Sequence, residues 1–224
     1  MTSDTFRSGL IPACLALAAV FLLGSCQSAY YGAMEKVGVH KRDLLVKRVA
    51  ASRDEQEEAK EQFTSALDAF MAVVEVEPSE LESQYKRLNK QLENSEDAAE
   101  RVRDRIDSVE DVAEALFREW ENELEMYSSP QLRRSSEDQL RDTRRRYEQL
   151  IDAMHRAESR MEPVLVAFRD QVLYLKHNLN AQAIASLQNE VSVLESEIEN
   201  LVREMQAAID EATSFIDAME GEAV

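Results

Sequence analysis

The chain has 224 residues and a formal net charge of −18, from 26 Lys and Arg against 44 Asp and Glu, and it contains only 5 Gly and 4 Pro. This shortage of turn-forming residues argues against β-sandwich and βαβ folds, and the length allows one domain or two small ones. The acidic balance argues against a nucleic-acid partner, because phosphate contacts need a basic surface.

Residues 1–25 predict a secretory signal peptide. Residues 10–23 form an uncharged apolar run that is shorter than the roughly 20 residues needed to span a bilayer. The run ends in Leu23-Gly24-Ser25-Cys26, which resembles the bacterial lipobox, where the signal is cut before the cysteine and the cysteine carries lipid. Cys26 is therefore the expected lipidation site. The alternative is an ordinary signal peptide that happens to contain this cysteine.

Acylation of Cys26 would leave no cysteine for a disulfide, a metal site or nucleophilic catalysis, since Cys14 lies in the segment that would be removed. Residues 26–38 would then form a lipidated tether, and its acyl chains would give stable membrane anchoring. In bacterial lipoproteins, an Asp after the cysteine tends to retain the protein in the inner membrane. Gln27 stands there, so the resemblance implies the periplasmic face of a Gram-negative outer membrane.

Residues 39–220 predict a domain of long helices, because no glycine occurs between Gly38 and Gly221 and apolar residues recur at alternating spacings of three and four. Apolar seams this long indicate helices that pack at small crossing angles. The expected fold class is all-α, with long antiparallel coiled-coil-like helices in an up-down-up-down four-helix bundle. The seams include Phe63, Phe70, Leu88, Ile106, Trp120, Tyr147, Met154, Phe168, Leu194, Met205 and Phe215.

Serine and proline residues predict where two of the helices begin. Ser79 offers an N-cap with Glu82 three residues on, which is a capping box. Ser129 offers an N-cap with Pro130 at the first helical position. Pro163 lies inside an apolar repeat that continues without a slip, so it predicts a kink within a helix.

The apolar repeat slips by one residue between Leu175 and Leu187. Either the chain turns within residues 176–181, with asparagine in a capping or left-handed role, or one very long C-terminal helix continues through a stutter. With a turn, the expected helices cover about 34–76, 79–127, 130–177 and 181–219. With a continuous helix, the chain has three helices, and the second half of the last one needs a dimer partner.

Two surface features are candidate interaction sites. With a turn at residues 176–181, His177, Asn178 and Asn180 become exposed polar groups at the end of the bundle away from the membrane, where loop residues often carry binding. Helix capping by the asparagines is the alternative. The second candidate is a membrane-proximal basic collar, in which each cation could contribute about 1 kcal/mol beside anionic headgroups. The collar comprises Lys36, Lys41, Arg42, Lys47 and Arg48, and the arginines of residues 130–147 begin at the same level. Ion pairing within the bundle is the alternative.

No catalytic constellation is visible in the sequence. It has no P-loop, dinucleotide fingerprint or G-x-S-x-G motif, and its three histidines lie far apart. Asp152 and His155 have the spacing of a bundle metal site, but such sites need inward acidic residues and the seams contain none. We therefore expect no catalytic residues, no metal and no other cofactor, and we expect that the protein is not an enzyme.

Three motifs resemble those of one known family. They are residues 30–43 (YYGAMEKVGVHKRD) behind the lipobox, residues 116–124 (LFREWENEL) and residues 170–181 (DQVLYLKHNLNA). They are similar to the bacterial lipoprotein family called domain of unknown function 2959, over nearly the whole mature chain. The resemblance implies a Gram-negative envelope lipoprotein, and it implies no activity and no catalytic residues.

These observations predict a membrane-anchored periplasmic lipoprotein that acts as a structural or protein-interaction module of the cell envelope. Its expected partners are the membrane, through the N-terminal lipid, and a protein of unknown identity, and a homo-oligomer remains open. A carrier of lipid or another apolar ligand is the alternative, since seam methionines suit adaptable packing. These methionines are Met154, Met161, Met205 and Met219. A hydrolase that uses carboxylates is a further alternative.

Overall fold

The computed structural model describes residues 40–221. The chain divides into two compact units, residues 1–44 and residues 45–224, of which the second is the helical bundle. Between residues 40 and 221 the regular structure is entirely helical, which confirms the all-α class. In the same stretch, no helix combines the length and the apolar character needed to cross a bilayer. The expected signal peptide, the tether and Cys26 lie outside the described residues.

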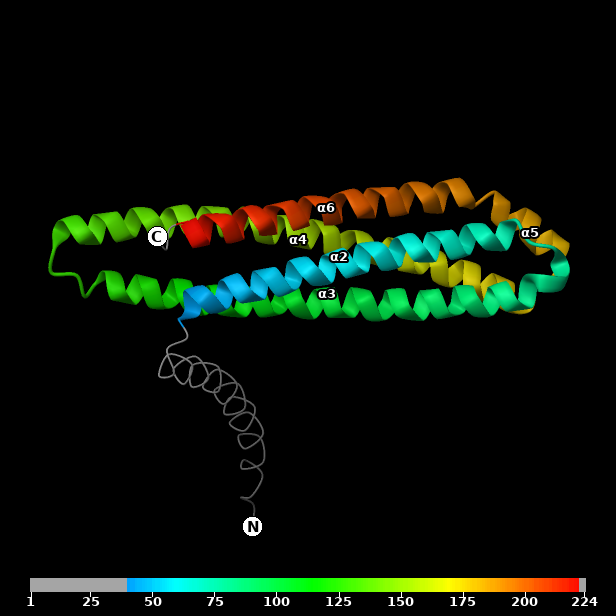
Figure 1. Ribbon diagram of the computed structural model, residues 1–224, viewed down its shortest axis with the longest axis horizontal. Helices are drawn as coiled ribbons and strands as arrows, with labels where there is room; N and C mark the ends of the chain where they lie inside the picture. The colour runs from blue at the N-terminus through cyan, green and yellow to red at the C-terminus, as the bar shows by residue number, and fades with distance from the viewer. Residues whose placement is uncertain (1–39, 222–224) are drawn as a thin grey trace, which may run out of the picture. The chain divides into compact units, whose positions relative to one another are not determined.

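Four long helices build the bundle. The two middle ones, α3 and α4, have 44 and 48 residues, against 34 for α2 and 31 for α6. As a result, α3 and α4 extend past the start of α2 and the end of α6 (Figure 1). The bounds are α2 Lys41–Val74, 3-10 helix η1 Pro78–Glu80, α3 Leu81–Leu124, α4 Pro130–His177, α5 Ala181–Gln188 and α6 Val191–Gly221.

Polar contacts between the helices show that neighbouring helices are antiparallel. Glu55 pairs with Arg101 and Gln62 bonds to Gln91, so residue numbers rise along α2 as they fall along α3. Helices α3 and α4 show the same inverse register, because Glu110 contacts His155 and Glu96 contacts Arg169. Arg156 of α4 contacts Glu204 of α6. Along α2, Lys60 bonds to Gln206 of α6 and Val74 bonds to Gln188 of α5, so α2 is also antiparallel to the C-terminal helices. The helices therefore form an up-down-up-down bundle in the cyclic order α2, α3, α4, α6.

The core follows the predicted apolar seams. Phe63, Phe70 and Phe168 are fully buried, and the rings of Phe70 and Phe168 meet edge-to-face with centroids 6.3 Å apart. This pair joins α2 to α4 across the diagonal of the bundle, so the four seams share one core. The seam also buries polar side chains, including Gln56, whose amide has no hydrogen-bond partner among the described residues. Such a group costs free energy, because it has lost its hydration without a replacement.

The chain turns at residues 178–180, so the alternative of one continuous C-terminal helix is wrong. Asn180 caps α5 by accepting a hydrogen bond from the backbone N–H of Ala183, at 3.1 Å. Asn178 ends α4 with φ −132°, so it has no left-handed conformation, and its amide donates to the carbonyl of Tyr174. A second break, at residues 189–190, was not predicted. There the side chain of Asn189 donates to the carbonyl of Ala185, and local bonds of this kind compete with the helix.

The two predicted serine caps have different outcomes. Ser129 is the N-cap of α4, with its hydroxyl accepting from the N–H of Leu132 at 3.4 Å. Ser79 is not an N-cap, because it lies inside the 3-10 helix that begins at Pro78. The residue before a proline is pushed into the extended region, and Glu77 has φ −68° and ψ 145°. The turn therefore begins one residue before Ser79. Pro163 lies inside α4, as expected.

Candidate functional site: the groove between α3 and α4

An open groove of about 510 Å³ lies between α3 and α4, near the end where these two helices extend past α2 and α6. Its position follows from helix periodicity, because residues three and four apart on α3 share one face and α4 adds two more side chains opposite. Four carboxylates and two guanidinium groups line it, so the groove is acidic. The lining residues are Glu110, Asp111, Glu114, Phe117, Arg118, Glu121, Arg144 and Tyr147.

Two aromatic rings form the apolar part of this groove. Phe117 is buried and Tyr147 is half-buried, and their ring centroids are 5.4 Å apart in an edge-to-face arrangement. The guanidinium of Arg144 lies 4.9 Å from the centroid of the Phe117 ring, and it also pairs with the carboxylate of Glu121 at 2.9 Å. The groove therefore already holds one cation between an aromatic face and a carboxylate, which is the arrangement that recognises cationic groups.

The phenol of Tyr147 responds to the negative charge around it. Burial, together with the smaller effect of the nearby carboxylates of Glu110 and Glu114, raises the pKa of Tyr147 to about 12. The phenol is therefore neutral at any physiological pH. It can donate a hydrogen bond in the groove, but it cannot serve there as a phenolate base.

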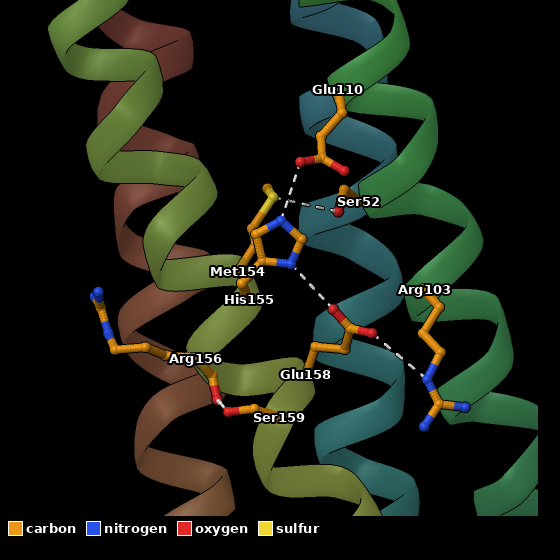
Figure 2. Close-up of polar contacts among 8 residues, drawn as sticks. All are labelled: Ser52, Arg103, Glu110, Met154, His155, Arg156, Glu158 and Ser159. Atoms are coloured by element: carbon orange, nitrogen blue, oxygen red, sulfur yellow. Dashed lines mark hydrogen bonds and ion pairs between the residues drawn. The ribbon is translucent and has the colours of Figure 1, made fainter.

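A polar network continues along the same two helices from Glu110 (Figure 2). The imidazole of His155 lies between two carboxylates, with Nε2 at 3.0 Å from Glu110 and Nδ1 at 3.1 Å from Glu158. Glu158 in turn lies 3.6 Å from Arg103 on α3. Partial burial is the largest single influence and lowers the pKa of His155, but the hydrogen bonds to Glu110 and Glu158 and the negative charge of these carboxylates together raise it by more, so the net shift of this pKa is upward.

This network links α3 to α4 and does not form a metal centre. Between residues 40 and 221, no three His, Cys, Asp or Glu side chains are grouped so that they could hold a metal ion. The partners of His155 are Glu110 and Glu158, whereas the sequence spacing had pointed to Asp152. Carboxylates and aromatic rings of the kind that line the groove are groups that contact organic cations.

The predicted interaction residues lie at the opposite end of the bundle. His177 is the last residue of α4, and it is exposed. Asn178 and Asn180 use their side chains to bond to the backbone of α4 and α5. These bonds match the alternative in which the asparagines cap helices, and they leave His177 as the free polar group of this turn.

The predicted basic collar is only partly within the described residues. Lys36 lies outside them, and Lys41 and Arg42 begin α2. Further along α2, Lys47 is exposed and Arg48 is half-buried. In the second basic segment four arginines pair with carboxylates, three within α4 and one with α3, and only the pair to α3 matches the alternative of ion pairing between helices of the bundle. The pairs are Arg133 with Glu137, Arg141 with Asp138, Arg145 with Asp142, and Arg144 with Glu121.

The groove was not predicted from the sequence. One signal was present: Leu116 and Phe117 are adjacent and both large, so only one of them could follow the seam. The structure buries both, and Phe117 contacts Tyr147 at the side of the bundle. The seam residue Trp120 is half-buried, and its indole N–H donates to the hydroxyl of Ser136 at 2.8 Å.

The fold and the groove define this protein as an antiparallel helical bundle with an acidic surface groove that contains two aromatic rings. The chain belongs to the family described as protein of unknown function (DUF2959), whose model matches residues 30–219. This match confirms the family resemblance of the three sequence motifs. No curated protein and no solved structure is significantly similar to the chain.

Proposed function

We propose that this protein is a lipid-anchored module of a Gram-negative cell envelope, facing the periplasm, that binds a partner protein through the groove between α3 and α4. One observation carries the binding role: Arg144 lies in this groove between the ring of Phe117 and the carboxylate of Glu121. A basic side chain of a partner would meet the same chemistry, because Glu110, Asp111 and Glu114 supply further negative charge.

A peptide titration tests the binding role. The probes are acetyl-Ala-Arg-Ala-amide and its citrulline counterpart, which has the same shape and no charge, and the readout is the NMR signals of Phe117 and Tyr147. We expect saturable shifts with the arginine peptide only. Phe117→Leu should weaken binding by roughly 3-fold, the low end of cation–π contacts, because Phe117 is buried and Arg144 already lies over its ring. Glu199→Gln, on the exposed face of α6, is the control variant. Equal shifts with both peptides would contradict the proposal.

The proposed anchoring rests on Leu23-Gly24-Ser25-Cys26 behind an apolar run. We expect the mature N-terminal peptide to carry acyl mass on Cys26, and we expect Cys26→Ser to abolish this mass and leave the signal uncut. Mass spectrometry of the N-terminal peptide measures both. A wild-type peptide without acyl mass would show that the anchoring proposal is wrong, whatever the groove binds.

The alternative of an apolar-ligand carrier has less support. Met154, Met161 and Met205 are fully buried in the core, and the hydroxyl of Ser52 lies 3.8 Å from the sulfur of Met154. These side chains fill the space between helices, which is the ordinary use of methionine in a core. No observation in the described residues favours the carrier over the interaction module.

A further inference from the structure

The connection between α3 and α4 exposes three apolar side chains close together. Met126 is 78% exposed, Tyr127 is 42% exposed and Leu132 is 59% exposed. Single exposed apolar residues are normal on a protein surface, but these three fall within one turn of chain and the first turn of α4. We call residues 125–132 the hairpin end.

The hairpin end extends beyond the other helices of the bundle (Figure 1). Arg156 on α4 pairs with Glu204 on α6, and α6 ends 17 residues later at Gly221. In antiparallel helices this places the end of α6 level with about residue 139 of α4, whereas α4 begins at Pro130. About two turns of α4 therefore project past α6, and neither α2 nor α6 covers the apolar side chains at the tip.

The backbone of the hairpin end is held by local hydrogen bonds. The N–H of Met126 donates to the carbonyl of Glu123 at 3.0 Å, and Ser129 caps α4 with Pro130 at its first position. The apolar side chains are thus presented by a defined turn, so contact with a partner surface requires little further ordering of the backbone.

The course of the chain indicates which surface this end meets. Helix α2 begins on the same side of the bundle as the hairpin end (Figure 1), and the bundle unit begins at Leu45. Cys26 precedes Leu45 by 19 residues, which span at most about 65 Å of chain. A lipid on Cys26, as the proposed function has it, would tether this side of the bundle within that distance of the bilayer.

The charges around the hairpin end favour apolar rather than electrostatic contact. Arg133 pairs with Glu137 at 2.9 Å, and the one further cation there, Arg134, is outweighed by Glu123 and Glu125. The end therefore has no basic excess for anionic headgroups to attract. Tyr127 has an amphipathic ring, of the kind that occupies the headgroup zone of bilayers.

We propose that the hairpin end inserts Met126, Tyr127 and Leu132 into the headgroup zone of the bilayer that anchors the chain. The bundle then has two contacts with the membrane, the lipid and this end, and its orientation relative to the membrane is restrained. This inference rests on the proposed lipid anchor.

Lipid-borne quenching of a fluorescent label tests the inference on the full lipidated protein. Leu132→Cys and Val193→Cys are the matched variants, because their parent side chains are 59% and 56% exposed at opposite ends of the bundle. Each is labelled with a nitrobenzoxadiazole group and reconstituted into vesicles of phosphatidylethanolamine and phosphatidylglycerol that contain a headgroup-depth nitroxide lipid. Met126→Cys repeats the measurement if Leu132→Cys does not fold.

We expect the label at residue 132 to be quenched at least about 3-fold more than the label at residue 193, as for a group at interfacial depth. The difference should persist in phosphatidylcholine vesicles, since no anionic lipid is needed. Equal quenching at the two sites, or quenching that vanishes in phosphatidylcholine, would overturn the inference. The inference would also be overturned if the label at residue 132 were shielded from solvent in native envelope vesicles but not quenched in vesicles of pure lipid. The hairpin end would then bind a protein of the envelope and not the bilayer.

Vesicle flotation, run first on the unlabelled protein, separates this inference from the anchor on which it rests. Protein that fails to float shows that the proposed anchor is wrong, and the inference then fails with it. Protein that floats, with equal quenching at residues 132 and 193, leaves the anchor in place and overturns the hairpin contact alone.

Discussion

At the residue scale, the pair of Phe70 and Phe168 joins α2 to α4 across the diagonal of the bundle. Phe168 is fully buried against Phe70. We expect Phe168→Ala to lower the free energy of unfolding by about 3–5 kcal/mol, because the cavity adds to the loss of buried apolar surface. Urea denaturation measures this change. Leu173→Ala is the control, since Leu173 is on the same helix and 52% exposed. Equal effects of the two changes would contradict the described core.

His155 gives a pH dependence whose sign follows from its contacts. Its pKa is raised in the folded protein, so its contribution to stability is fully present below the ordinary value of about 6.5 and is lost as pH rises through the folded pKa. We expect His155→Gln to lower the free energy of unfolding more at pH 5.5 than at pH 9. The difference should stay below about 1 kcal/mol, because the side chain is 45% exposed.

The control for this pH dependence is His177→Gln, in the exposed turn at the other end of the bundle. Thermal unfolding at both pH values compares the two variants. If His155→Gln lowered the free energy of unfolding equally at pH 5.5 and pH 9, the contacts of His155 with Glu110 and Glu158 would not favour the charged imidazole.

At the scale of elements, the turn between α4 and α5 decides the architecture. Arg160 on α4 and Glu199 on α6 are exposed, so spin labels there avoid the core. In the bundle the two helices pack side by side, and we expect a distance of about 10 Å between helix axes plus the length of the labels. A continuous helix would separate the labels by roughly 58 Å. Double electron–electron resonance distinguishes these values, and a distance near the larger one would contradict the four-helix bundle.

At the scale of the whole molecule, the net charge of −18 opposes the compact state through self-repulsion. Salt screens this repulsion, and it also weakens ion pairs, but exposed pairs contribute only about 0–1 kcal/mol each. We expect the Tm to rise by roughly 2–4 °C between about 10 mM and 300 mM NaCl, which corresponds to about 1 kcal/mol.

KCl is the control for this salt effect, because screening by simple salt does not depend on the identity of the cation. Calorimetry in both salts gives the comparison. A Tm that falls with salt would mean that ion pairs between helices, such as Glu55 with Arg101, outweigh the general repulsion.

Features that depend on residues close together in the chain were predictable from the sequence. The apolar repeat placed Phe63, Phe70 and Phe168 in the core, and the cap at Ser129 depends on only four residues. The slip between Leu175 and Leu187 indicated the turn at residues 178–180. Two local features were not predicted, and each has a local cause. The cap at Ser79 does not form because the 3-10 helix begins at Pro78. The break after α5 occurs where the side chain of Asn189 bonds to the backbone of α5.

The groove and the hairpin end were decided by the tertiary structure. An apolar repeat shows which side of a helix faces inward, but the neighbours and axial register of that helix depend on contacts between distant residues. Phe117 meets Tyr147, and Glu110 meets His155, only because α3 and α4 pack antiparallel at one register. The same register, with helices of unequal length, leaves Met126 and Leu132 uncovered at the hairpin end.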